Sequence, residues 1–286
     1  MAARGPNTGA VGSTDVITVD GVVELVEGRP SILSGPHELA MVYGGGGVFG
    51  IAYGTGVAHG LVEAGIDVGA APALGTSAGS WVASIMALGL PYEAIASIEV
   101  PTIPNARYGA LLKPARELFG DARHEQVAVS AVCVRTRRRH ILDGARFDLA
   151  DLAAASSAVP ALLPPHRVDG RLYVDGGMWS VTSIDAATDA SRVIVVAPLA
   201  GTVVGPMGRT AGWLLDRELR TWRERHPDKE IVAIRPNREI AAVAGLNPMG
   251  LFDIERALAA YPLALEQGRR WGERLQEPLP LGATVV

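Results

Sequence analysis

The sequence predicts a layered α/β domain, because short apolar runs of strand length alternate with longer stretches of helical spacing. Strands that alternate with helices favour a sheet whose faces are covered by helices. The chain has 286 residues, of which 48% are hydrophobic, and this is enough apolar material for one large core. The buried strands expected on this basis are LAMVY (39–43), APAL (71–74), SRVIVVAPL (191–199) and KEIVAIRP (229–236).

The chain is expected to begin with an extension before the core. Residues 1–14 are rich in glycine and small polar types, and β-branched residues surround an Asp-Gly step in DVITVDGVVELVEG (15–28). An Asp-Gly step between apolar runs predicts a small hairpin. We therefore divide the chain into a partly flexible N-terminal extension, residues 1–38, and a single domain, residues 39–286.

Within the domain, each expected strand leads into a helix or a turn. LAMVY precedes a helix over 48–65 with small residues on one face, and APAL leads through GTSAGS into a helix that ends near Leu90. The second half is expected to contain a proline-punctuated helical stretch (91–119), a strand pair (126–144), a helix ended by prolines (148–165), a hairpin (166–177), a helix between the last two strands, and an amphipathic helix (252–274).

Two uncharged segments resemble membrane spans in length. Residues 39–62 and 68–92 contain no aspartate, glutamate, lysine or arginine, and each is long enough to cross a bilayer of ~30 Å. Their internal glycines, and Pro72 in the second, would leave main-chain groups unpaired in lipid. We expect both segments to form strand, turn and helix units inside a soluble domain.

Charge and cysteine content limit the partners and the compartment. A net charge of −4 argues against a nucleic-acid partner, which usually requires a basic face. The lone Cys133 sits in an expected buried strand and cannot form an intramolecular disulfide, which suits a reducing compartment. The first residues lack the apolar core of a secretion signal. The expected location is the cytoplasm, with peripheral contact to a membrane.

The stretch VYGGGGVFG (42–50) concentrates glycine after a strand and before a helix. Gly45, Gly47 and Gly50 satisfy the G-x-G-x-x-G pattern of a dinucleotide-binding loop. Asp67 lies twenty residues beyond Gly47, but EAGID (63–67) is too short and glycine-broken to be the strand that such a site needs. A non-catalytic or nucleotide-binding module is kept as an alternative.

A second motif, GTSAG (75–79), fits the G-x-S-x-G pattern. Gly75 and Gly79 would permit a strained strand-to-helix turn that projects Ser77. The alternative is that Ser77 only caps the following helix. A serine nucleophile also needs a base and N–H donors for the oxyanion, and the glycine loop can supply such donors, because the first N–H groups of a helix have no intrahelical partners.

No histidine is well placed to act as the base. Of the six, His226 alone follows the acidic positions considered, and it lies in the charged stretch RERHPDKE (223–230); His166 is expected to be an ordinary loop or strand-edge residue. YVDGG (173–177) places Asp175 at the end of an apolar strand. A carboxylate base needs a raised pKa or a direct hydrogen bond to the hydroxyl; the alternative is that Asp-Gly-Gly is just a turn.

In this order and without a suitable histidine, GGGGVFG, GTSAG and DGG resemble the patatin-like phospholipase family. The resemblance runs from about Leu39 to Val196 and includes SSAVPALLPP (156–165). It implies a three-layer α/β/α fold with a central, mostly parallel sheet. It also implies hydrolysis of a lipid or other carboxylic ester through an acyl-serine intermediate, without metal or cofactor.

Carried onto the matching positions, the resemblance assigns a Ser-Asp dyad and an oxyanion hole. Its residues are Ser77 as nucleophile, Asp175 as general base, the amides of Gly45, Gly46 and Gly47 as oxyanion donors, and Gly50, Gly75, Gly79, Gly176 and Gly177 as motif glycines. An acyltransferase of related fold is the second enzymatic alternative, disfavoured because that class typically pairs its serine with histidine.

The sequence departs from the family pattern at two places. Phe49 stands where the family usually has arginine or lysine, and MWSVTSID (178–185) lacks the asparagine and proline often found after the aspartate. The residue that positions Asp175 is therefore left open. We further expect RTRRRH (135–140) to be a solvated hairpin tip rather than a lipid headgroup site, and Trp179, Trp213 and Leu214 to be core residues rather than an acyl-pocket lining.

Overall fold

A computed structural model of the chain describes residues 18–19, 22–24, 37–187 and 190–276. In these residues, ten strands form one sheet whose main path runs β1-β2-β6-β5-β4-β3-β9-β10, with β8 added to β5 and β7 to β8. The strands are β1 (Thr18–Val19), β2 (Val22–Glu24), β3 (His37–Tyr43), β4 (Ala73–Thr76), β5 (Val127–Cys133), β6 (Arg139–Asp143), β7 (His166–Val168), β8 (Arg171–Asp175), β9 (Ala190–Val196) and β10 (Glu230–Ile234).

The centre of the sheet is parallel and one side of it is antiparallel. Strands β5, β4, β3, β9 and β10 run parallel to one another. The pairs β5–β6, β6–β2, β5–β8 and β7–β8 are antiparallel. The strand pair and the hairpin expected over 126–144 and 166–177 are therefore present.

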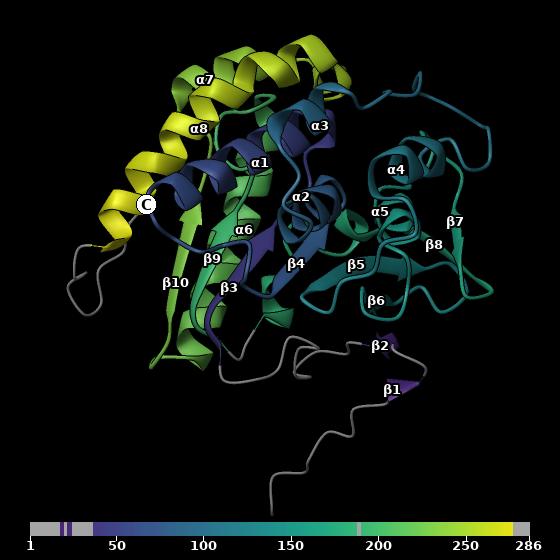
Figure 1. Cartoon of the computed structure of the whole chain (residues 1–286), viewed down its shortest axis with the longest axis horizontal. Helices are drawn as coiled ribbons and strands as arrows, with labels where there is room; N and C mark the ends of the chain where they lie inside the picture. Colours follow the sequence, from purple (N-terminus) through teal and green to yellow (C-terminus); the bar gives the residue numbers. More distant parts are fainter. Residues whose placement is uncertain (1–17, 20–21, 25–36, 188–189, 277–286) are drawn as a thin grey trace, which may run out of the picture.

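Helices cover both faces of the sheet, and Figure 1 shows α1 and α8 side by side on one face and α6 on the other. This confirms the three-layer α/β/α prediction. The helices are α1 (Gly47–Glu63), α2 (Ala78–Ala87), α3 (Tyr92–Ala96), α4 (Leu112–Phe119), α5 (Leu149–Ser156), α6 (Pro206–Arg225), α7 (Arg238–Ala244) and α8 (Ile254–Gln276), with 3-10 turns η1 (Gly176–Met178), η2 (Ile184–Ala186) and η3 (Pro248–Phe252).

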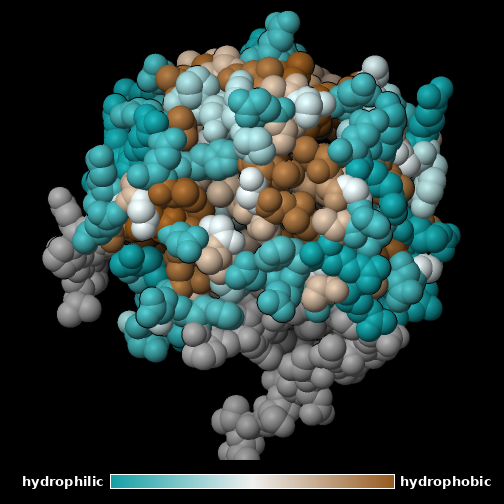
Figure 2. Space-filling model, viewed as in Figure 1, coloured by the Kyte–Doolittle hydropathy of each residue, from teal (hydrophilic) through white to brown (hydrophobic). Residues whose placement is uncertain are grey.

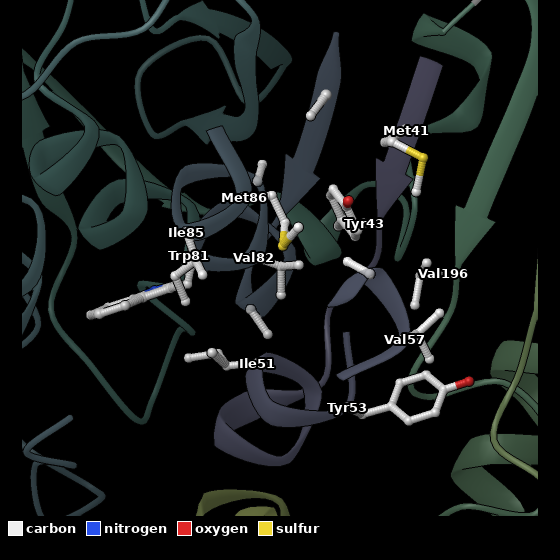
Figure 3. Packing of buried hydrophobic residues seen from close by; sticks show 14 of the residues in the cluster. Met41, Tyr43, Ile51, Tyr53, Val57, Trp81, Val82, Ile85, Met86 and Val196 are labelled. Carbon is white, nitrogen blue, oxygen red and sulfur yellow. The ribbon is translucent and has the colours of Figure 1, made fainter. Parts of the chain in front are cut away.

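Alternation along β3 shows how the sheet divides the core. Met41 and Tyr43 pack in the cluster that contains the α1 and α2 side chains, whereas Ala40 and Val42 pack in the cluster that contains the α6 side chains. Figure 3 shows Tyr43 of β3 near Val82 and Met86 of α2. Successive residues of a strand point to opposite faces, so a strand covered on both sides must be apolar throughout. This is why LAMVY reads as a continuous run.

Two helical predictions are too long. Residues 97–111 separate α3 from α4 and contain no helix, so the proline-punctuated helical stretch expected over 91–119 is interrupted for fifteen residues. Pro101 and Pro104 lie in this segment, and proline lacks the N–H that a helix interior needs. Helix α5 ends at Ser156, before Pro160, because the residue before a proline is pushed out of helical geometry.

The N-terminal strands β1 and β2 pair in antiparallel fashion, with Thr18 opposite Val23. Strand β2 in turn adds to β6. The Asp20-Gly21 step itself, residues 1–17 and residues 25–36 lie outside the described residues. The division of the chain after residue 38 stays a prediction.

The arginine-rich tip between β5 and β6 is only partly solvated. Residues 135–138 are exposed, but Arg139 and His140 are buried. The Arg139 guanidinium pairs with Asp185 at 2.7 and 2.5 Å, and the His140 ring lies 3.2 Å from the Tyr173 hydroxyl. The prediction of a solvated tip therefore fails for the last two residues, because they belong to β6 and enter the sheet.

The prediction that Trp213 and Leu214 are core residues is wrong. Trp213 is 61% exposed and Leu214 is 39% exposed. Helix α6 covers the sheet with Leu215, Leu219 and Trp222, which recur on one helical face. The two preceding residues fall on the other side of that face. Trp179, in the segment after β8, is also 47% exposed.

The two uncharged segments fold as strand and helix units, β3–α1 and β4–α2, as expected. Among the helices of the described ranges, none has both the length and the hydrophobicity that a membrane crossing requires.

Helices α1 and α8 approach each other through glycine. A Cβ atom added to Gly60 would lie 2.1 Å from the Leu265 carbonyl oxygen, and one added to Gly268 would lie 2.2 Å from the Val57 carbonyl oxygen. Both distances are far below any van der Waals contact, so the two helix backbones can pack this closely only without side chains at these positions. The small-residue face predicted for 48–65 is therefore the α8 contact.

Gly60→Ala should lower the free energy of unfolding by about 2 kcal/mol or more, because overpacking of a close contact typically costs ~1–3 kcal/mol. Chemical denaturation measures this change. Gly69→Ala is the control, since an added Cβ there meets nothing closer than 3.6 Å and should change stability by only about 0.5 kcal/mol. Equal denaturation midpoints for the two variants would contradict the packing described here.

Candidate active site

The site lies where two neighbouring parallel strands end. Strand β3 leads into the glycine loop and then into α1, and β4 leads through Ser77 into α2. Ligand sites of open α/β sheets lie at the carboxyl ends of the strands. Both sequence motifs therefore reach the same edge of the sheet.

Ser77 occupies a sharp strand-to-helix turn. Its backbone has φ 53° and ψ −123°, a region that costs a non-glycine residue about 1–3 kcal/mol. Two close approaches hold this turn. A Cβ on Gly75 would lie 2.4 Å from the Cα of Ser80, and a Cβ on Gly79 would lie 1.9 Å from the Tyr43 carbonyl oxygen. The two motif glycines are thus required by space, as in a nucleophile elbow.

A serine from α5 holds the main chain at Ser77. The Ser77 N–H donates to Ser156 Oγ at 2.8 Å, and Ser156 Oγ donates to the Ser130 carbonyl at 2.7 Å. The Ser80 hydroxyl also donates to the Ser77 carbonyl at 2.6 Å. Sequence reasoning missed this contact of Ser156, which was noted only as part of the SSAVP segment. No local pattern announces it, because it depends on α5 packing beside β5 and α2.

Asp175 meets Ser77 because β4 and β8 end against consecutive residues of β5. Thr76 of β4 lies opposite Ser130, and Asp175 of β8 lies opposite Ala131. Both strands occupy the edge of β5 that β6 leaves free, and they run toward each other, since β4 is parallel and β8 antiparallel to β5. Their ends therefore abut.

The Ser77 hydroxyl donates to Asp175 Oδ2 at 2.6 Å across a separation of 98 residues. The other carboxyl oxygen, Oδ1, accepts the Gly177 N–H at 2.6 Å. Asp175 is only 5% exposed, and burial raises its pKa to about 6, although both hydrogen bonds act in the opposite direction. A carboxyl group in water has a pKa near 4, so this environment makes Asp175 a stronger base.

Neither histidine weighed from the sequence contacts Ser77. His166 Nε2 lies 2.8 Å from Asp151 Oδ1, and its ring stacks on Tyr108. His226 packs against Trp222 of α6. The expectation that His166 is an ordinary strand-edge residue agrees with these contacts.

The glycine loop offers two free amides rather than the three expected. The Gly45 N–H donates to the Val181 carbonyl at 2.9 Å, so this donor is already used and the assignment of Gly45 to the oxyanion hole needs correction. Within the described residues, no hydrogen bond uses the N–H of Gly46 or Gly47. Gly46 is the N-cap of α1 and Gly47 is its first residue. Both amides therefore lie at the positive end of the helix dipole, which favours negative charge.

The remaining glycines of the motifs allow close approaches. A Cβ on Gly50 would lie 3.1 Å from the Ala78 Cβ, where α1 passes α2, and a Cβ on Gly176 would lie 2.3 Å from the Ser130 carbonyl oxygen. Gly45 faces the serine, since its added Cβ would lie 3.3 Å from the Ser77 Cβ. These positions bring the three loops of the site together.

Phe49, which replaces the basic residue usual at this place, is fully buried. Its ring lies parallel to that of Tyr53, with the ring centroids 6.2 Å apart. The side chain thus points into the core rather than toward a substrate. Apolar packing anchors the start of α1 here.

An apolar cavity opens beside Ser77, with an empty volume of about 550 Å³ that includes space open to solvent. Figure 2 shows hydrophobic side chains near the middle of the face on which Figure 1 draws α2 and α3. Glu99 is the charged residue among those lining the cavity, and it pairs with Lys113 at 2.8 Å. The apolar lining includes Val48, Ile51, Trp81, Ile98, Val100, Ile103, Leu111, Val159, Leu163 and Phe252.

Trp179, Trp213 and Leu214 do not line this cavity. Trp179 and Leu214 border a different cavity, between α6 and the segment after β8. The acyl-pocket alternative for these residues is therefore not supported. The apolar residues at the site come instead mainly from α1, α2 and the segment 97–111, with Val159, Leu163 and Phe252 from elsewhere, and sequence reasoning did not single them out.

The fold and the site together define a three-layer α/β/α protein in which a serine on a nucleophile-elbow turn is hydrogen-bonded to a buried aspartate. Residues 97–188 match the family model described as patatin-like phospholipase, a range that contains Ser156 and Asp175. Over this range the chain is similar to the patatin-like phospholipase family.

Part of this chain is similar to curated proteins and to a solved structure. The chain is 31% identical over 208 residues to proteins called uncharacterized NTE family proteins, from Mycobacterium bovis and from two strains of Mycobacterium tuberculosis. Each match covers 63% of this chain and 56% of the relative, so the chain spans little more than half the length of the curated relatives that it matches. Among solved structures it is similar to VipD from Legionella pneumophila, with 14% identity and a TM-score of 0.42 over 88% of this chain and 68% of that one.

The raised pKa of Asp175 predicts a pH-dependent stability difference. Burial favours the protonated form of Asp175 in the folded state. The stabilisation that this protonated carboxyl gives is complete below pH ~4, and it is lost as the pH rises from there through about 6. Asp175→Asn removes this titration. Between pH 4 and pH 8, the free energy of unfolding of the variant should therefore rise relative to wild type by up to about 3 kcal/mol, at 1.36 kcal/mol per pKa unit.

Urea denaturation at several pH values measures this difference. Asp228→Asn, at an exposed position, is the control and should show a difference from wild type that does not change with pH. A flat profile for Asp175→Asn as well would mean that the carboxyl is not desolvated as described.

Proposed function

We propose that this chain is a lipid acyl hydrolase that cleaves a carboxylic ester through an acyl-serine intermediate. The observation that carries the proposal is the 2.6 Å hydrogen bond from Ser77 Oγ to Asp175 Oδ2 at a strained elbow. A serine hydroxyl becomes a useful nucleophile when a base is in hydrogen-bond contact with it. The match of residues 97–188 to the patatin-like phospholipase model supports the same class of reaction.

In the proposed first step, Ser77 Oγ attacks the ester carbonyl carbon while its proton passes to Asp175 Oδ2. The carbonyl oxygen becomes an oxyanion, which the free N–H groups of Gly46 and Gly47 stabilise. When the tetrahedral intermediate collapses, the carbon–oxygen bond to the alcohol breaks and Asp175 returns its proton to the leaving oxygen. The products of this step are the acyl-serine and the free alcohol.

In the proposed second step, Asp175 takes a proton from a water molecule that attacks the acyl carbon. Collapse of the second intermediate releases the carboxylic acid and returns the proton to Ser77. A pKa of about 6 suits both roles of Asp175. The carboxyl is mostly ionised at neutral pH, so it can accept a proton, and it is a stronger base than an ordinary aspartate. The Gly177 N–H keeps Oδ1 occupied and leaves Oδ2 for the serine.

The apolar cavity beside Ser77 supports a substrate with a hydrocarbon acyl chain. Burial of such a chain is favourable in proportion to the apolar area removed from water, and side chains from several elements line this space. The nucleotide-binding alternative lacks comparable support. Asp67 Oδ1 accepts the N–H of Ala70 in a local turn, and the cavity at the glycine loop is lined mainly by apolar residues.

Ser77→Ala should abolish hydrolysis of p-nitrophenyl esters and labelling by a fluorophosphonate probe, since both reactions need the serine oxygen. Asp175→Asn should stay folded and lose about 10² to 10⁴-fold in turnover, the usual contribution of a general base. Cys133→Ala is the control and should react normally with the probe. Persistent labelling of Ser77→Ala would refute the assignment of the nucleophile.

Assays with and without an acceptor alcohol distinguish hydrolysis from acyl transfer.

The pH dependence of kcat/KM should report the carboxyl that acts as base. Below pH about 6, kcat/KM should fall about tenfold per pH unit, because only the ionised form of Asp175 accepts the serine proton. Residual activity of Asp175→Asn should lack this acid limb. Initial rates in a constant-ionic-strength buffer series measure the profile, and an acid limb retained in the variant would assign it to another group.

A further inference from the structure

The segment from Gly176 to Ser183 contacts both halves of the site. At its start, the Gly177 N–H donates to Asp175 Oδ1. In its middle, the Val181 carbonyl accepts the Gly45 N–H at 2.9 Å. A movement of this segment would therefore change the direction of the Asp175 carboxyl and the placement of the glycine loop together.

Packing holds only part of this segment, since Ser180, Thr182 and Ser183 are buried but the two residues before them are not. Met178 is 63% exposed and Trp179 is 47% exposed. A cavity with an empty volume of about 460 Å³, part of it open to solvent, separates the segment from α6, with Gly177 and Trp179 on one side and Leu214 on the other. Side chains that border empty space lose the contacts that would otherwise hold them. Polar contacts therefore contribute to where this part of the segment lies.

Glu218 of α6 reaches across this cavity. The Ser180 hydroxyl donates to Glu218 Oε1 at 2.8 Å, and the Thr182 hydroxyl donates to Glu218 Oε2 at 2.9 Å. Ser180 Oγ in turn accepts the Ser183 N–H at 2.9 Å. The two oxygens of one carboxylate thus bind the residues on both sides of Val181.

We propose that Glu218 is a positioning residue, which acts through Ser180 and Thr182 to hold Asp175 and the glycine loop in register. This inference rests on the proposed function. MWSVTSID lacks the asparagine and proline often found after the family's aspartate, which left open the residue that positions Asp175. Helix α6, on the face of the sheet away from α1 and α2, supplies this anchor through Glu218. Hydrogen bonds to charged groups are stronger than neutral ones, so the carboxylate suits a segment in which Met178 and Trp179 are exposed.

The electrostatics of Glu218 agree with a role beyond stability. Burial raises the pKa of this glutamate, and the two hydroxyl donors lower it. A desolvated carboxylate is a costly way to fill space, and a residue of similar length without charge would avoid that cost. Retaining the charge here is consistent with the need for two directed hydrogen bonds.

The test uses steady-state kinetics with a p-nitrophenyl ester and the rate of fluorophosphonate labelling. Glu218→Met keeps the side-chain length and removes both hydrogen bonds, whereas Glu218→Gln keeps a polar group that can bond both hydroxyls. Glu218→Met should lower kcat about 10 to 100-fold with KM within about threefold, since misplacement by 1 Å can cost 10²-fold. Glu218→Gln should restore most of kcat. Glu224→Met, at an exposed position of the same helix, is the control and should match wild type.

The outcomes separate this inference from the proposed function. A wild-type chain that neither hydrolyses esters nor takes the probe would refute the proposed function, and the role of Glu218 with it. Wild-type turnover with an unchanged kcat in Glu218→Met would overturn the role of Glu218 alone. If Glu218→Met does not fold, Thr182→Val removes one of the two bonds at nearly constant shape. A severalfold loss of kcat would then support the inference, and an unchanged kcat would overturn it.

Discussion

The hydrogen bond between Ser77 Oγ and Asp175 Oδ2 depends on the pairing around β5. One edge of this strand is shared, with β4 alongside its first part and β8 alongside its last part. The two strands run toward each other, so the residue after β4 and the last residue of β8 must meet. A shift of β8 by one residue would turn the Asp175 side chain to the other face of the sheet. The geometry of the site therefore depends on this register.

Close backbone approach is the second constraint, and glycine satisfies it at each point. Gly79 lets α2 begin against the end of β3, Gly50 lets α1 pass α2, and Gly176 lets the chain turn beside Ser130. The contacts at Gly79 and Gly176 leave no room for a Cβ atom and the one at Gly50 leaves little, so the three loops of the site sit close together. The strained backbone of Ser77 persists because its surroundings hold it on every side.

The polar groups of the site form a chain of contacts that reaches both faces of the sheet. On one face, Ser156 connects the Ser77 N–H to β5. On the other, Glu218 holds the segment whose Val181 carbonyl occupies the Gly45 N–H. This use of Gly45 leaves Gly46 and Gly47 as the free amides. The same segment that contacts the proposed base thus also determines which glycine amides stay free.

The sequence by itself determined the α/β class, the order of most elements, and the motifs that carry Ser77 and Asp175. It could do so because strand and helix periodicity, tight turns and glycine-rich loops depend on residues that are close along the chain. Only the tertiary structure decided that Ser77 and Asp175 touch, that Gly45 is not a free donor, and that Trp213 and Leu214 are exposed. It also revealed Ser156 and Glu218. These facts depend on strand register and on which face of a helix meets the sheet, and both are set by contacts between segments far apart in sequence, which no local pattern records.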